Sequence, residues 1–369
     1  MIELSILDQP DKIRSIDKSG MLETCEKMPD LCRDAIKRAK KVKIPFGQPE
    51  NIIVAGMGGS AIGGNLLKDW LYDRASIPVE VCRDYDLPAY ADENSMVIAV
   101  SYSGETEETL NTFLKAVKRH CPILTITSGG HLQSFSEKLK IPHMLIPSGL
   151  APRAAVAYTS LPLIIVIEKL QIIKEVKDEI EETLKILQKI SKENGLEVYL
   201  KSNEAKRLAS EIKGTIPIVY GFRQYSAIAR RLKCQFNENS KVPSKFDVFP
   251  ELNHNEVVGW EAPKKLTKTF STIFLRDPDE SLEIKHRIEI TKQIVAPKVS
   301  KVLEIQVQGK LKLAKMFSGM YLGDFASIYL ALLGGVDPSP TKTIVHLKQE
   351  MKKKLDMTAR FEEELAKIR

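Results

Sequence analysis

Residues 51–64 read NIIVAGMGGSAIGG, an apolar segment that runs into five glycines with one serine among them. The pattern predicts a β-strand, a glycine-rich turn and the start of a helix whose periodicity continues to residue 73. Backbone N–H groups and the helix dipole favour an anion at the N-terminus of such a helix. We therefore expect the ligand of this protein to carry a phosphate group.

Strand and helix signals alternate after this turn. Nearly all-apolar segments of strand length occur at residues 52–55, 79–82, 97–103, 123–127 and 143–147, and helical patterns occur at residues 60–73, 105–120 and near Ser134. Buried strands that alternate with amphipathic helices predict a parallel sheet with helices on both faces. We expect a doubly wound α/β domain, preceded by one packing helix over residues 17–42.

The same order recurs in the second half of the chain. Residues 216–241 again read as an apolar strand, a glycine, a turn and a helix, with Ser226-Ala227-Ile228 in the place of Ser60-Ala61-Ile62. This internal repeat predicts two copies of one αβα unit, and the charged residues 174–194 between them predict a connecting surface helix. The second copy lacks the glycine cluster, so we expect only the first copy to hold phosphate.

The composition argues against several classes of protein. The 55 Lys and Arg stand against 48 Asp and Glu, a thin excess of +7 that suits small anionic ligands better than nucleic acid. The N-terminus does not resemble a signal peptide, and the longest apolar run, residues 161–167, is far shorter than the ~20 residues that span a bilayer. We expect a cytoplasmic protein with no membrane contact. Scattered cysteines without a C-x-x-C pair argue against disulfides and a metal site: Cys25, Cys32, Cys82, Cys121 and Cys234.

The glycine turn alone leaves several ligands open. Residues 56–61 match the loose dinucleotide pattern G-x-G-x-x-A, which favours a nicotinamide or flavin enzyme, and the acid that would bind the ribose has one candidate, Asp84. Ser60 at the start of the helix is also explained as an ordinary N-cap. The Walker pattern for nucleotide phosphates does not occur in this turn.

A second loop favours a phosphomonoester over a dinucleotide as the ligand. Residues 101–106, SYSGET, follow another apolar strand and open another helix. In a doubly wound sheet, the loops at the carboxyl ends of neighbouring strands converge on one crevice. Two hydroxyl-rich helix starts in that crevice would hold one phosphomonoester without a metal.

The two loops together resemble the sugar isomerase (SIS) domain, which binds phosphosugars. Within that group the chain resembles the bifunctional phosphoglucose/phosphomannose isomerases, a branch of the phosphoglucose isomerase superfamily with two SIS domains. The resemblance runs from about residue 51 to residue 348. It rests on six separated motifs in order: GMGGSAIGG, SYSGETEET, PSGLAPRAA, FNENSK, PELNHNE and PSPTKTIVHLK.

The resemblance implies a homodimer that interconverts glucose 6-phosphate or mannose 6-phosphate with fructose 6-phosphate, with no cofactor. A cyclic sugar must be opened, and a proton must move between C2 and C1 through an enediolate. The expected fold class is α/β, with two doubly wound αβα sandwich domains and mainly parallel sheets. The expected segments are an N-terminal helical segment (1–45), a first, phosphate-binding SIS domain (46–170), a helical connection (171–200), a second SIS domain (201–340) and a C-terminal helix that completes the active site (341–369).

The resemblance also assigns roles to single residues. Glu238 is the base that moves the proton, with Glu251 and Glu256 as nearby competitors. His254 assists ring opening from the partner subunit, and its flanking asparagines favour a placed imidazole. The other implied residues are Lys348 for ring opening, Arg153 for stabilising the enediolate, Thr341 for accepting both C2 epimers, and Ser60, Ser101, Ser103 and Thr106, with the backbone of Gly58 and Gly59, for holding the phosphate.

Two further functions stay open from the sequence. An NAD(P)-dependent oxidoreductase would bind its cofactor at the glycine turn. A non-catalytic SIS regulator would keep the phosphate loops but would not need Glu238 and His254. The ratio of glucose 6-phosphate to mannose 6-phosphate activity depends on the shape of the pocket near Thr341.

Overall fold

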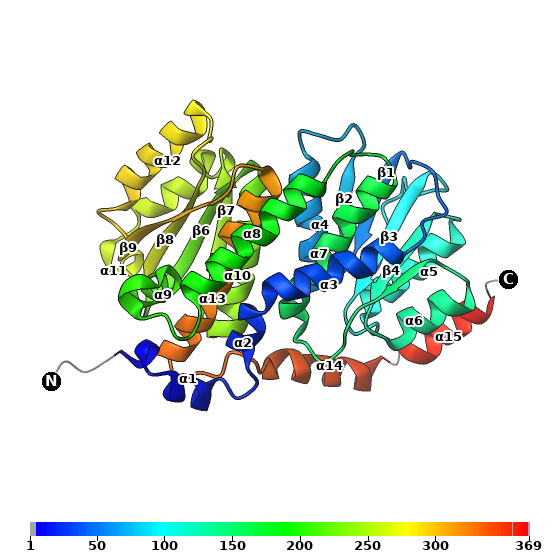
Figure 1. Ribbon diagram of the computed structural model, residues 1–369, viewed down its shortest axis with the longest axis horizontal. Helices are drawn as coiled ribbons and strands as arrows, with labels where there is room; N and C mark the ends of the chain where they lie inside the picture. The colour runs from blue at the N-terminus through cyan, green and yellow to red at the C-terminus, as the bar shows by residue number, and fades with distance from the viewer. Residues whose placement is uncertain (1–4, 356, 368–369) are drawn as a thin grey trace. The chain divides into compact units, whose positions relative to one another are not determined.

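The structure, a computed structural model, describes residues 5–355 and 357–367, which form two compact units (Figure 1). Unit 1 consists of Met1–Pro29 and Lys177–Pro340, and unit 2 of Asp30–Val176 and Thr341–Arg369. Each unit is built around one parallel sheet, as the alternating strand and helix signals predict.

Unit 2 contains the glycine turn and a five-stranded sheet in the order β2-β1-β3-β4-β5, in which every pair of neighbours is parallel. The central strand β3 is wholly buried, because helices cover both faces of the sheet. The strands are β1 (Asn51–Ala55), β2 (Val79–Cys82), β3 (Ser95–Ser101), β4 (Ile123–Thr127) and β5 (His143–Leu145). The helices are α3 (Met28–Lys41), α4 (Gly58–Leu71), α5 (Glu107–Lys118), α6 (Gly130–Lys138), α7 (Val156–Lys169), α14 (Lys342–Lys354) and α15 (Met357–Lys367).

Unit 1 repeats this topology with one strand fewer, in the order β7-β6-β8-β9, again all parallel. The predicted repeat is thus confirmed, since β6 and α10 occupy the topological places of β1 and α4. The strands are β6 (Ile216–Phe222), β7 (Lys245–Phe249), β8 (Phe270–Arg276) and β9 (Lys301–Gln306). The helices are α1 (Pro10–Ile16), α2 (Met21–Glu26), α8 (Lys177–Asn194), α9 (Glu204–Ile212), α10 (Ser226–Gln235), α11 (Lys264–Thr267), α12 (Leu282–Val295) and α13 (Lys312–Leu333).

The centre of unit 1 is α13. This helix is long and apolar enough to cross a membrane, but its apolar window is 94% buried within the protein, the pattern of a core helix. It packs against α8 and α9, and against α2 at the start of the chain, where the Tyr321 hydroxyl donates a hydrogen bond to the Cys25 carbonyl (2.7 Å).

Three expectations about helices need revision. The single helix expected over residues 17–42 is two helices, α2 and α3, because Pro29 has no N–H to continue a helix begun at Met21. The charged helix α8 is more than a connection, since its buried Ile180, Leu187 and Ile190 face α13. The C-terminal segment forms α14 and α15 rather than one helix.

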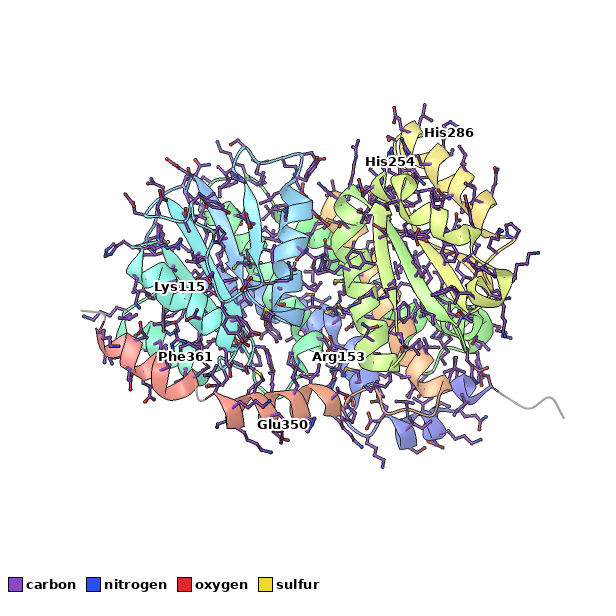
Figure 2. All side chains as sticks on the ribbon, turned by 180° about the vertical axis from the view of Figure 1, so that it is seen from behind. Lys115, Arg153, His254, His286, Glu350 and Phe361 are labelled. Carbon is purple, nitrogen blue, oxygen red and sulfur yellow. The ribbon has the colours of Figure 1, made fainter. Side chains whose placement is uncertain are left out.

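Helix α15 belongs to the core of unit 2. Its apolar residues recur every four positions, at Met357, Phe361 and Leu365, and all three are buried in the cluster that includes α5 (Figure 2). An ion pair between Lys118 and Glu364 supports the contact. The helix that follows α14 in the chain is therefore anchored in the core of unit 2.

Candidate active site

The two predicted phosphate loops meet at the carboxyl edge of the sheet in unit 2. They follow β1 and β3, neighbouring strands whose connections run to opposite sides, which is where doubly wound folds bind ligands. The Tyr102 N–H donates to Ser60 Oγ (3.3 Å) and joins the loops. The Ser101 hydroxyl donates to Thr106 Oγ1 (2.9 Å), and the side chain of Ser103 is exposed. The structure thus brings Ser60 close to the 101–106 loop.

The glycines let a third segment approach these loops. A Cβ on Gly59 would lie 2.8 Å from the Pro152 carbonyl oxygen and 3.2 Å from the Arg153 Cα, whereas Gly58 has open space and a φ of +50°. The missing side chain of Gly59 therefore allows the 3₁₀ helix Pro152–Ala155 to pack on the turn. Glycine is also favoured at position 58, because L-residues rarely adopt this backbone conformation.

Arg153 lies in that 3₁₀ helix and is only 4% exposed. The Cα of Arg153 lies beside Gly59 at the N-terminus of α4, so this residue brings a buried positive charge to the region of the helix's backbone N–H groups. This part of unit 2 is therefore suited to binding an anion, either the phosphate or a negatively charged intermediate.

Thr341 and Lys348 come from the C-terminal segment of unit 2. Thr341 is the residue before α14 and is partly exposed, and Lys348 is exposed on the helix. Burial raises the pKa of the Glu107 carboxyl, helped by Glu108, and the charge of Lys348 lowers it in part. Glu107 follows Thr106 directly, so the charge of Lys348 acts on a carboxyl next to the second phosphate loop.

Glu238 lies in unit 1, in a π-helical turn at Phe236–Ser240 that ends α10. The turn is held by its buried neighbours: Asn239 Nδ2 donates to Ser327 Oγ (2.9 Å), and the Ser240 hydroxyl donates to the Ser327 carbonyl (2.6 Å). Lys241 follows with a φ of +58° and donates to the Glu238 carbonyl (2.5 Å). The half-buried Glu238 side chain therefore projects from a rigid turn, and π turns are frequent at functional sites.

His254 is exposed on a loop that its two flanking asparagines hold. Asn253 Nδ2 donates to Thr291 Oγ1 of α12 (2.8 Å), and Asn255 Nδ2 donates to Glu251 Oε1 (2.8 Å). Glu256 accepts a hydrogen bond from the Tyr220 hydroxyl (2.7 Å), and burial raises the pKa of its carboxyl. Both competing glutamates thus have structural partners in this loop.

Within unit 1, Glu238 and His254 lie at opposite edges of the sheet. Asn237 Oδ1 accepts from the Ser244 N–H (2.9 Å), and the Ser244 hydroxyl donates to the carbonyl of Pro217 at the start of β6, so Glu238 is at the amino edge. His254 follows the carboxyl end of β7, a strand whose five residues span about 13 Å. The unit therefore does not bring these two residues together.

The crevice of unit 1 that corresponds to the phosphate site is filled by side chains. The buried Tyr225 donates a hydrogen bond to Asp277, and Lys315 Nζ forms ion pairs with Asp277 (2.8 Å) and Asp279. Two carboxylates at this position would repel a phosphate. This finding supports the expectation that only the glycine-rich copy holds phosphate.

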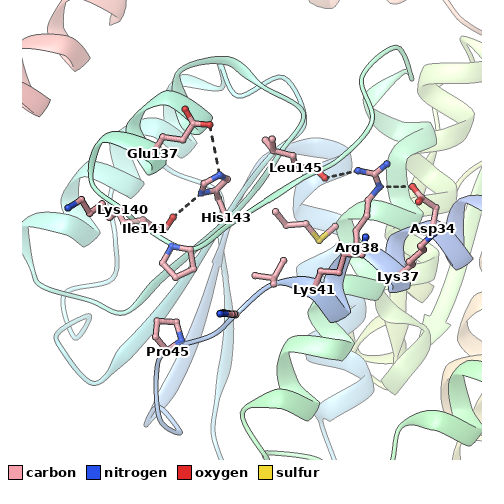
Figure 3. A pocket seen from close by; sticks show the side chains of 14 residues that line it. Asp34, Lys37, Arg38, Lys41, Pro45, Glu137, Lys140, Ile141, His143 and Leu145 are labelled. Carbon is pink, nitrogen blue, oxygen red and sulfur yellow. Dashed lines mark hydrogen bonds and ion pairs between the residues drawn. The ribbon is translucent and has the colours of Figure 1, made fainter.

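A pocket of about 840 Å³ lies elsewhere in unit 2, between the end of α3 and the edge strand β5 (Figure 3). Arg38 bridges its walls, with Nε 2.6 Å from Asp34 and a hydrogen bond to the Leu145 carbonyl (3.3 Å). The residues described as lining it include none of the predicted site residues. No group of three or more His, Cys, Asp or Glu side chains that could hold a metal occurs among the described residues.

Comparison with known proteins agrees with the fold of two related domains. Residues 46–145 match the model of the SIS domain family, and residues 201–351 match that of the bacterial phospho-glucose isomerase C-terminal SIS domain. A bifunctional phosphoglucose/phosphomannose isomerase from Caldicellulosiruptor bescii is 42% identical over 90% of this chain and 98% of its own. The enzyme of the same description from Thermoplasma volcanium is 35% identical over 86% of this chain and 96% of its own.

More distant similarities show the fold. The C-terminal domain of glucosamine-fructose-6-phosphate aminotransferase from Francisella tularensis superposes with a TM-score of 0.67 at 18% identity, and covers 87% of this chain and 98% of its own. A D-glucosamine-6-phosphate 4-epimerase from Sulfolobus acidocaldarius is 29% identical over 84% of this chain and 91% of its own.

Proposed function

Since this chain belongs to the family of bifunctional phosphoglucose/phosphomannose isomerases, we propose how its residues carry out the isomerisation. The enzyme interconverts glucose 6-phosphate or mannose 6-phosphate with fructose 6-phosphate. The observation that carries the assignment of the site is the packing of Arg153 against Gly59, at the N-terminus of the helix that the first phosphate loop begins. We infer a cytoplasmic enzyme that uses no cofactor.

In the proposed mechanism the phosphate is held by Ser60, Ser101, Ser103 and Thr106, with the N–H groups of Gly58 and Gly59. His254 and Lys348 open the sugar ring by moving a proton from the C1 hydroxyl to the ring oxygen. Glu238 then takes the proton from C2 of the open aldose and returns it to C1, while the hydroxyl proton of O2 passes to O1, so that an aldehyde at C1 becomes a ketone at C2. The guanidinium of Arg153 stabilises the negative enediolate between these steps, and Thr341 contacts the sugar where both C2 epimers must fit.

We also propose that His254 acts in the site of a second copy of the chain. The support is topological, because Glu238 and His254 lie at opposite edges of one sheet and cannot reach the same sugar from one chain. In a homodimer, the His254 of each copy can act on the same sugar as the Glu238 of the other copy.

The function is tested by coupled assays with glucose 6-phosphate and mannose 6-phosphate, with and without a chelator. We expect activity with both epimers and no effect of the chelator; no flux with either epimer refutes the function. Glu238→Gln should abolish isomerisation and keep phosphosugar binding, since the amide cannot take the proton. Full turnover by this variant would exclude Glu238 as the base and would leave Glu251 and Glu256 to be tested.

Mixed dimers test the exchange of His254. His254→Ala and Lys348→Ala chains should each be inactive alone. After reassortment about half of the dimers contain one chain of each kind, with one complete site of two, so about a quarter of the wild-type activity should return. No recovery in verified mixed dimers means that each site uses its own histidine.

The rival functions have their own tests. Titration with NADH or NADPH, followed by fluorescence, would reveal an oxidoreductase. A regulator would bind phosphosugar equally well with His254→Ala and would turn none over.

A further inference from the structure

Tyr102 lies in the second phosphate loop, between two serines assigned to the phosphate, and no step of the proposed mechanism uses it. Its side chain is only 7% exposed, whereas the neighbouring Ser103 is exposed. Tyr102 directly follows β3, the central strand of the sheet in unit 2. Because the sheet is parallel, the segments after β1, β4 and β5 lie at the same edge as Tyr102.

Every polar group of Tyr102 bonds to one of these segments. Its N–H donates to Ser60 Oγ in the segment after β1 (3.3 Å). Its carbonyl accepts from both the N–H (3.0 Å) and the hydroxyl (2.6 Å) of Ser128, which follows β4. Its hydroxyl reaches the segment after β5, where it donates to the Pro147 carbonyl (3.0 Å) and accepts from the Leu150 N–H (2.7 Å).

The Tyr102 hydroxyl is the polar anchor of the turn at residues 147–150. Strand β5 is two strands away from β3, about 10 Å across the sheet, so a long side chain is needed to bridge the distance. In the part of the chain that the structure describes, residues 147–150 make no hydrogen bonds other than those to Tyr102. Gly149 in this turn is exposed, with a φ of +91° and no atom within 4 Å of an added Cβ.

Arg153 follows this turn closely. It comes three residues after Leu150, in the 3₁₀ helix Pro152–Ala155, where the Ala154 N–H donates to the Ala151 carbonyl (2.8 Å). On its other side the same 3₁₀ helix packs on Gly59. The backbone of Arg153 is thus held between the first phosphate loop and the turn that Tyr102 anchors. A shift of the turn moves Arg153, because Pro152 restricts the backbone between them.

The phenol of Tyr102 is suited to holding this turn rather than to proton transfer. Burial raises the pKa of the phenol, and the bond from the Leu150 N–H lowers it in part. The hydroxyl therefore keeps its proton at neutral pH and keeps its donor bond to Pro147. Its donor and its acceptor capacity are both used within the protein.

We propose that Tyr102 is a positioning residue for Arg153: its hydroxyl fixes the 147–150 turn, and the turn fixes the residue that stabilises the enediolate. The proposal rests on the proposed function in one respect, that Arg153 has this role. The loop that holds the phosphate of the sugar then also sets the position of the positive charge that acts at C1 and C2.

Tyr102→Phe tests this role, because it removes only the hydroxyl and keeps the buried ring. The phosphate contacts remain, and Arg153 is needed most when the negative charge forms. The kcat should therefore fall about tenfold while KM stays within about twofold of the wild type. Tyr321→Phe is the matched control: this buried hydroxyl donates to the Cys25 carbonyl in unit 1, and its loss should leave kcat and KM unchanged. Circular dichroism and urea denaturation verify the fold of both variants.

The binding of two inhibitors, measured by calorimetry, separates Arg153 from the phosphate loops. The hydroxamate group of 5-phosphoarabinonohydroxamate mimics the enediolate, whereas glucitol 6-phosphate carries the phosphate but no such group. Tyr102→Phe should raise the Kd of the hydroxamate about tenfold and that of glucitol 6-phosphate by less than about twofold. An unchanged Kd for the hydroxamate would overturn the proposal. An equal loss of affinity for both inhibitors would do so too, because Tyr102 would then hold the phosphate loop.

A double variant tests whether Tyr102 acts through Arg153. In an Arg153→Gln background, Tyr102→Phe should lower kcat by less than about twofold more, whereas losses that multiply would contradict the proposal. If the buried Arg153→Gln does not fold, the two inhibitors decide alone. A wild type with no flux on either hexose 6-phosphate refutes the proposed function. An active wild type whose kcat and hydroxamate affinity are unchanged by Tyr102→Phe refutes only the role of Tyr102.

Discussion

Replacing Gly59 by alanine tests the packing on which the site of unit 2 depends. The new Cβ would lie 2.8 Å from the Pro152 carbonyl oxygen, whereas ordinary van der Waals contact begins at 3.4 Å. The turn that carries Arg153 must therefore move by 3.4 − 2.8 = 0.6 Å, and all the nearest atoms are backbone, which cannot rotate away. Overpacking of this kind costs about 1–3 kcal/mol of unfolding free energy.

The catalytic effect should exceed the loss of stability. A 1 Å misplacement of a catalytic group can cost about 10²-fold in rate, so a 0.6 Å shift of Arg153 predicts a kcat reduced roughly ten- to twentyfold. The measurements are kcat and KM in the coupled assay, and urea denaturation for stability. Gly47→Ala is the control, since nothing lies within 4 Å of its new Cβ. Gly59→Ala with wild-type kcat would show that Arg153 does not need its observed position.

Three further predictions follow from other parts of the structure. Asn239→Ala removes the hydrogen bond to Ser327 that holds the Glu238 turn; we expect a loss of about 1–3 kcal/mol in urea denaturation and a lower kcat, and an unchanged kcat would mean that the turn does not position Glu238. Burial raises the pKa of Glu256 in the folded state, so folding favours its protonated form, and its contribution to stability falls as the pH rises from 4.5 toward the raised folded-state pKa. The unfolding free energy of Glu256→Gln, relative to that of the wild type, should therefore be greater at pH 7 than at pH 4. A difference that does not depend on pH would contradict this. Phe361→Ala should destabilise the packing of α15 on unit 2 by about 3–5 kcal/mol, as measured by hydrogen exchange in α15. It should also lower the turnover rate, because Lys348 on the preceding helix assists ring opening. Unchanged exchange in α15 would show that Phe361 does not anchor this helix.

Much of the fold follows from local sequence. Val54 and Ile98 lie in neighbouring buried strands, and a run of such residues has few alternatives to a parallel sheet once helices lie between the strands. The repeat at Ser226 indicates both units, and the glycine cluster predicts which of them holds phosphate. Pro29 indicates the break between α2 and α3, but the apolar periodicity on either side of it favours one continuous helix.

The geometry of the site follows from tertiary contacts that the sequence does not display. The π turn at Glu238 has the same local preferences as an ordinary helix end, and it exists because Asn239 and Ser240 bond to Ser327 on α13. The many charged residues of α8 predict a surface helix, and they make its buried face hard to predict although Ile180, Leu187 and Ile190 have helical spacing. The approach of Arg153 to Gly59 joins segments almost a hundred residues apart, and no local pattern specifies such a contact.

The packing of α2 on α13 has a consequence for the order in which the nascent chain folds. Cys25 and its partner Tyr321 are separated by 296 residues, so at about 10 residues per second the ribosome delivers the partner roughly half a minute after the first helices emerge. During that interval Met21, Leu22 and Cys25 lack the contacts of α13, although all three are buried in the finished protein. Helix α2 therefore completes its packing only after α13 has been made, late in the synthesis of unit 1.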